Sequence, residues 1–242
     1  MQISHHFWEA SELGRTIRLN RYGERGVPFL AFPAQDGDHR NLEDFGLISA
    51  IEPIIEQGRA QVFTIDSYDK ESWTSNLHPA EKALRHEAYA NFILREIVPF
   101  IKHTTQATPW TTGVSMGAYH AANFLFRFPF HFDGVIALSG IYELSQFIGE
   151  YSDENVYFNT PLWFLSNLQD PYYLDEIRKK KIVLCVGQGA WEEPMLSHTR
   201  RIGDILREKN IPAWVDIWGP DVYHDWPWWH RQLPYFMDKV LP

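Results

Sequence analysis

A serine flanked by glycines is the residue whose setting most clearly suggests chemistry. The segment Gly113-Val114-Ser115-Met116-Gly117 has the form G-x-S-x-G. Residues 109–112 before it are typical of a short strand, and residues 118–128 after it carry Ala, Leu and Phe at helical spacing. A strand, a sharp turn and a helix in this order form a nucleophile elbow, which exposes the serine hydroxyl at the turn. We therefore expect Ser115 to act as a nucleophile.

The same segment has a simpler interpretation, because a serine in a glycine-rich turn can cap the next helix with its side chain. The motif alone leaves both interpretations open. If Ser115 is the nucleophile, the backbone N–H of Met116 is an expected oxyanion donor, since a helix N-terminus favours negative charge. A second donor usually comes from the loop after the third strand. That loop, 33–38, begins with a proline that has no N–H, and we favour Gln35 over Ala34 as the donor.

A histidine follows the last expected strand, 213–218. In that position His224 can take the proton of Ser115 and later return it to a leaving group. The simpler interpretation is a loop histidine between tryptophans that bonds a backbone group, but the elbow and the position after the last strand favour a catalytic base. His230 lies inside the expected final helix, 227–240, and is less free to reach the elbow.

A carboxylate that orients this histidine is expected in the loop after the strand 181–186. That loop offers Glu192 and Glu193. We favour Glu192, because Glu193 directly precedes the proline at the start of the next helix, where a glutamate can simply stabilise the helix dipole. Asp221 and Asp225 lie near the histidine in sequence, but a turn residue and a helix N-cap explain them better.

The order of the expected elements predicts the fold class. Two strands of alternating polarity are followed by repeated strand–helix units, which predicts an α/β fold with a mostly parallel sheet and helices on both faces. Catalytic groups in such a sheet lie at the carboxyl ends of the strands. The segment 142–172 is expected to form short helices and loops. The remaining expected strands are 5–10, 15–22, 27–32, 60–65 and 134–138, and the remaining helices are 48–57, 79–102 and 194–209.

Length and charge restrict the kinds of partner. A chain of 242 residues with 45% hydrophobic residues fits one α/β domain over residues 1–242. The net charge of -9 disfavours binding to nucleic acid or to an anionic membrane. We expect a small-molecule substrate, and the sequence leaves room for a homo-oligomer.

Cysteine and histidine usage restrict the compartment and the cofactors. Cys185 is the only cysteine and lies within an expected buried strand, so we expect a core residue and no disulfide. The N-terminus has neither a basic region nor an apolar run, which predicts no signal peptide, no membrane span and a cytoplasmic location. The histidines show no metal-ligand spacing and there is no phosphate loop of the form G-x-x-x-x-G-K, so we expect neither metal nor cofactor.

With these motifs, the chain resembles the α/β-hydrolase superfamily, and within it the putative-esterase branch of esterase D-type enzymes, feruloyl esterases and mycolyltransferases. The resemblance rests on the G-x-S-x-G motif and on the block His224-Asp225-Trp226-Pro227-Trp228-Trp229, since that branch places aromatic residues just after its catalytic histidine. It implies a serine hydrolase with Ser115 as nucleophile, His224 as base and a carboxylate after the seventh strand. The acid loop departs from the branch, because many members carry Asp where this chain has Ala190 and Trp191.

The leading hypothesis is a serine hydrolase that cleaves carboxylic esters through an acyl-enzyme intermediate on a triad of Ser115, His224 and Glu192. A thioesterase or an acyltransferase on the same triad is the alternative within enzymes. A non-catalytic binding protein on a hydrolase scaffold is the alternative from another class. That last hypothesis predicts that no carboxylate reaches His224 within hydrogen-bond distance.

Overall fold

The computed structural model describes all 242 residues. One sheet of 8 strands runs through the molecule in the order β1-β2-β4-β3-β5-β6-β7-β8. β1 pairs antiparallel with β2, and β2 pairs antiparallel with β4, while every other neighbouring pair is parallel. This confirms the predicted mostly parallel sheet. The strands are β1 (Ile3–Ala10), β2 (Arg15–Tyr22), β3 (Val27–Phe32), β4 (Ala60–Ile65), β5 (Trp110–Val114), β6 (Gly134–Leu138), β7 (Lys181–Val186) and β8 (Trp214–Ile217).

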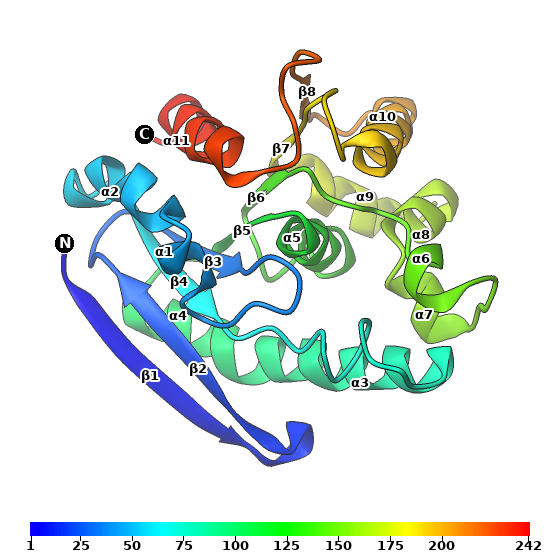
Figure 1. The fold of residues 1–242 in the computed structure, drawn as a ribbon, viewed down its shortest axis with the longest axis horizontal. Coiled ribbons are helices and arrows are strands. Elements are labelled where there is room, and N and C mark those ends of the chain that lie inside the picture. The colour runs from blue at the N-terminus through cyan, green and yellow to red at the C-terminus, as the bar shows by residue number, and fades with distance from the viewer.

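Helices cover both faces of this sheet (Figure 1). Those that follow the strands are α2 (Leu47–Glu56), α3 (Pro79–Phe92), α4 (Val98–Thr105), α5 (Met116–Arg127), α10 (Glu193–Glu208) and α11 (Trp226–Val240). The segment predicted as short helices and loops contains α6 (Ser145–Ile148), α7 (Glu154–Phe158), α8 (Pro161–Asn167) and α9 (Pro171–Arg178), which confirms that prediction. None of the helices combines the length and the apolar composition that a membrane-spanning helix requires.

Neighbouring residues of a central strand face opposite sides of the sheet, so the sheet separates two hydrophobic cores. Phe29 and Ala31 of β3 lie in the core that also contains the apolar faces of α2 and α11. Leu30 and Phe32 of the same strand lie in the core built with α3, α4 and α5. Figure 1 shows the same division, with α2 and α11 together on one side and α3 and α5 on the other. The central strands are thus rigid supports for the loops at their carboxyl ends.

The predicted helix over 79–102 is helical throughout but not uniform. A π-helical turn, η2 (Ile93–Ile97), joins α3 to α4, and the helical stretch continues to Thr105. Pro99 gives a physical reason, because its ring would clash with the carbonyl of the residue four positions earlier in a regular helix. A wider turn just before the proline relieves that conflict. The structure also contains a short helix that the sequence did not predict, α1 (Asn41–Asp44).

Candidate active site

The turn between β5 and α5 has the geometry of a nucleophile elbow. Ser115 has φ 55 and ψ -121, a conformation that non-glycine residues rarely adopt. The flanking glycines are required by close packing: a Cβ on Gly113 would lie 2.3 Å from the carbonyl carbon of Gly117, and one on Gly117 would lie 2.3 Å from the carbonyl oxygen of Phe32. The strand extends two residues beyond the predicted end and the helix begins two residues before the predicted start, which makes the turn tighter than expected.

Ser115 does not cap the helix with its side chain. The structure has no side-chain capping hydrogen bond at this position. The hydroxyl instead lies next to His224, with Oγ and Nε2 2.9 Å apart. The capping interpretation is therefore wrong, and the hydroxyl is available for a proton transfer to the imidazole.

The other ring nitrogen of His224 faces a carboxylate. Its Nδ1 lies 3.2 Å from Oε2 of Glu192, whereas Glu193 is exposed. Backbone hydrogen bonds join the two loops that carry these side chains: the N–H of His224 donates to the carbonyl of Ala190 (3.0 Å), and that of Gly189 donates to the carbonyl of Val222 (2.7 Å). The structure thus brings together the three side chains that the sequence predicted as a set.

The carboxylate of Glu192 is buried, with 1% of its surface exposed. A buried charge is costly unless hydrogen bonds replace water. Its Oε1 accepts from the hydroxyl of Ser139 (2.6 Å) and from the N–H of Gly187 (3.3 Å), and this leaves Oε2 directed at His224. The carboxylate is therefore held in one orientation.

Sequence reasoning missed Ser139, which follows β6 and supports the acid. It has φ 55, and besides donating to Glu192 it accepts a hydrogen bond from the indole N–H of Trp229 (3.2 Å). The Trp229 ring also stands edge-on to the imidazole of His224, at 5.0 Å between centroids and 89° between planes. A polar residue at the carboxyl end of the strand next to the elbow strand is a signal that could have indicated Ser139.

The sequence predicted two backbone N–H groups, those of Met116 and Gln35, as oxyanion donors. Met116 begins α5, so its N–H has no partner within the helix. In the loop after β3, the N–H of Ala34 donates to Oδ1 of Asn41 (3.0 Å), whereas that of Gln35 has no acceptor in the protein. The Phe32 carbonyl directly before this loop packs against the first turn of α5, as the close contact at Gly117 shows.

The remaining candidates take no part in the hydrogen bonds that join Ser115, His224 and Glu192. His230 lies in α11 with Nε2 2.8 Å from the carbonyl oxygen of Phe45, and Asp225 caps α11 by accepting from the N–H of Trp226 (2.8 Å). Cys185 is buried, and burial raises the pKa of its thiol well above the ordinary value, which keeps the thiol protonated. No group of three or more His, Cys, Asp or Glu side chains forms a metal-binding arrangement.

Comparisons with known proteins identify the family and the fold of this chain. The model of the family described as "Putative esterase" matches residues 16–237. A ferulic acid esterase superposes with a TM-score of 0.76 at 15% identity, over 99% of this chain and 97% of its own. An S-formylglutathione hydrolase from Staphylococcus aureus gives 0.69 at 16% identity, over 99% of both chains. A ferulic acid esterase from the fungus Anaeromyces mucronatus gives 0.69 at 14% identity, over 98% of this chain and 89% of its own.

No curated protein matches the sequence significantly. The structural likenesses lie at low identity and show the α/β-hydrolase fold, while the family model covers most of the chain. The chain therefore belongs to the putative esterase family, and it is a carboxylic ester hydrolase.

Proposed function

We propose that the chain hydrolyses carboxylic esters through an acyl-enzyme intermediate on Ser115, with His224 as base and acid and Glu192 as the residue that orients His224. One observation carries the proposal. A continuous chain of contacts runs from the hydroxyl through the imidazole to a buried carboxylate, with distances of 2.9 Å and 3.2 Å. Unrelated serine hydrolases use this arrangement to make an alcohol reactive at neutral pH.

The proposed reaction has two halves. Ser115 Oγ forms a bond to the acyl carbon while its proton passes to Nε2 of His224, and collapse of the tetrahedral intermediate expels the alcohol, which takes that proton. Water then attacks the acyl carbon and gives a proton to the same nitrogen of His224. When the second tetrahedral intermediate collapses, His224 returns this proton to Oγ of Ser115, and the carboxylic acid is released. The N–H groups of Met116 and Gln35 are the proposed donors to the oxyanion in both halves.

The binding-protein alternative is less well supported. It requires that no carboxylate lie within hydrogen-bond distance of His224, whereas Glu192 lies at 3.2 Å. Thioester hydrolysis or acyl transfer would use the same groups and differ only in the leaving group or the acceptor. Matched oxygen and sulfur esters of one acyl group, with and without an added alcohol, distinguish these reactions by rate and by product.

Reaction with a fluorophosphonate probe tests the proposal directly. We expect the probe to modify the folded protein at Ser115, and Ser115→Ala to lose both labelling and hydrolysis of p-nitrophenyl esters. Ser145 provides a matched control, because its hydroxyl is exposed and bonds a glutamate but no histidine, so Ser145→Ala should keep both. A folded protein that hydrolyses esters without modification of Ser115 would overturn the proposal.

A further inference from the structure

In the turn that carries Gln35, the N–H of this residue has no acceptor, whereas the N–H groups of the neighbouring residues donate hydrogen bonds. The N–H of Gly37 donates to the carbonyl of Ala34 (2.9 Å) and closes the turn. The N–H of Ala34 is occupied by a side-chain amide, as described above, and that of Asp36 donates to Oδ2 of Asp69 (3.2 Å). Within this turn, only the N–H of Gln35 lacks an acceptor.

The residue after Gln35 adopts a left-handed backbone conformation, which is unfavourable unless other contacts stabilise it. Asp36 has φ 60, which costs an aspartate on the order of 1 kcal/mol. Two contacts hold it there: its N–H bonds Asp69, and its own Oδ1 accepts from Oγ1 of Thr74 at 2.6 Å. Both partners belong to the segment that follows β4, so this segment fixes the peptide groups next to the proposed oxyanion donor.

The same carboxylate reaches the helix that begins at the nucleophile. Oδ1 of Asp69 lies 2.8 Å from Nε2 of His120, and the two side chains are 0% and 2% exposed. Because His120 is in α5, which starts directly after Ser115, one buried carboxylate bonds the helix of the nucleophile and the turn of the oxyanion donor. The chemistry proposed for the site does not use either side chain.

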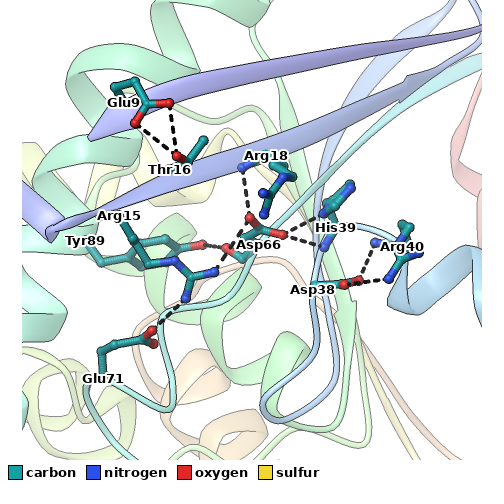
Figure 2. Close-up of polar contacts among 10 residues, drawn as sticks. All are labelled: Glu9, Arg15, Thr16, Arg18, Asp38, His39, Arg40, Asp66, Glu71 and Tyr89. Carbon is teal, nitrogen blue, oxygen red and sulfur yellow. Dashed lines mark hydrogen bonds and ion pairs between the residues drawn. The ribbon is translucent and has the colours of Figure 1, made fainter. Parts of the chain in front are cut away.

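A second aspartate fixes the far end of the same loop. Figure 2 shows Asp66 between the loop and the first hairpin: its Oδ1 accepts from the N–H of His39 (2.9 Å) and lies 2.7 Å from that residue's Nδ1, and its Oδ2 accepts from the N–H of Arg18 (2.9 Å). The turn around Gln35 is therefore anchored on both sides. Asp69 differs from Asp66 because it alone also reaches the nucleophile helix.

We propose that Asp69 is a positioning residue that aligns the N–H of Gln35 with Ser115 by tying the turn at Asp36 to His120. This inference rests on the proposed function. An oxyanion donor helps only when it points at the place where charge develops, and a displacement of about 1 Å can cost on the order of 100-fold in rate. Loss of Asp69 should therefore lower kcat and leave binding of the substrate in its ground state little changed.

The test compares kcat and KM for p-nitrophenyl acetate in Asp69→Ala, Thr74→Val and Glu87→Gln. We expect Asp69→Ala to lower kcat on the order of 10- to 100-fold with KM within about threefold of the wild type. Thr74→Val removes the other contact to Asp36 and should lower kcat about threefold. If Asp69→Ala does not fold, kcat of Thr74→Val alone tests whether the turn must be held in place. Asp69→Asn should recover much of the rate, since its amide oxygen can still accept from the N–H of Asp36.

Glu87→Gln is the matched control for stability. Glu87 pairs with Arg127, which lies in α5 like His120, but it makes no contact with the turn. We expect this variant to unfold at a lower temperature and keep the wild-type kcat. The inference is overturned if folded Asp69→Ala and Thr74→Val keep kcat within twofold, or if Glu87→Gln loses as much kcat as Asp69→Ala. Fluorophosphonate labelling of the wild type at Ser115 is scored separately, so failure of the proposed function is recognised independently.

Discussion

Replacement of Glu192 by glutamine is expected to reverse the tautomer of His224 and so remove the base. The structure decides which way the new amide points. Oε1 of Glu192 accepts from the N–H of Gly187 and from the hydroxyl of Ser139, so the amide oxygen takes that position and the NH₂ group faces Nδ1 of His224. Nδ1 must then accept a hydrogen bond, and the proton of a neutral imidazole moves to Nε2.

A protonated Nε2 has no lone pair for the hydroxyl of Ser115, which lies 2.9 Å away. The same acid-to-amide change in serine protease triads lowers kcat by about 10⁴-fold through the wrong tautomer, equivalent to about 5 kcal/mol in the barrier. We expect a loss of that order here. The fold should persist, because glutamine has the same shape and replaces a buried charge by a neutral group.

The assay is kcat for p-nitrophenyl acetate, with far-UV circular dichroism as the check on folding. Glu193→Gln is the control, since this neighbour is exposed and makes no contact with the imidazole. It should stay within about twofold of the wild type, as surface changes usually do. If Glu192→Gln kept most of its activity while Glu193→Gln lost it, the assignment of the acid and the tautomer argument would both be refuted.

Three further predictions concern support for the site and the fold. Ser139→Ala should lower kcat about tenfold and destabilise the protein by about 2 kcal/mol, because a hydrogen bond to the buried Glu192 carboxylate is lost; kinetics and urea unfolding that match the wild type would contradict this. Gly117→Ala should lose activity and stability together, since its Cβ would lie 2.3 Å from the Phe32 carbonyl oxygen, and an unchanged melting temperature would argue against the tight elbow. Burial, with smaller effects of His120 and Arg127, holds the pKa of His86 well below its ordinary 6.5, so below pH 6.5 the unfolded chain binds a proton that the folded chain does not. Stability should therefore fall by up to about 1.4 kcal/mol per pH unit below pH 6.5, and His86→Leu should flatten that dependence in urea titrations.

The pattern of residues along the chain was sufficient to predict the architecture. The central strands are short apolar runs such as Val27–Phe32 and Lys181–Val186, and both were predicted with the bounds that the structure has. Boundaries were less accurate at the elbow, where β5 extends to Val114 because the turn consists of Ser115 alone. The π-helical turn before Pro99 arises from the steric clash that one proline ring would make in a regular helix. Hydrophobic periodicity carries no information about such a clash.

At the site, the sequence predicted the residues that lie at the ends of strands. Ser115, His224 and Glu192 could be predicted from the order of elements, because parallel strands place their carboxyl ends along one edge of the sheet. Ser139 and Asp69 were not assigned a role, since their importance comes from contacts with residues far away in sequence. A serine or an aspartate in a loop has many ordinary explanations until the partner that it bonds is known.

Identification of the residue that is acylated during turnover shows directly whether Ser115 is the nucleophile. The protein is mixed with excess p-nitrophenyl acetate, quenched in acid during turnover, digested and mapped by mass spectrometry. We expect an added acetyl group on the peptide that contains Ser115, at its hydroxyl, and none in Ser115→Ala. Continued turnover with the acetyl group on a different residue would contradict this mechanism. So would continued turnover of the wild type with no acylated peptide, even under conditions that slow deacylation.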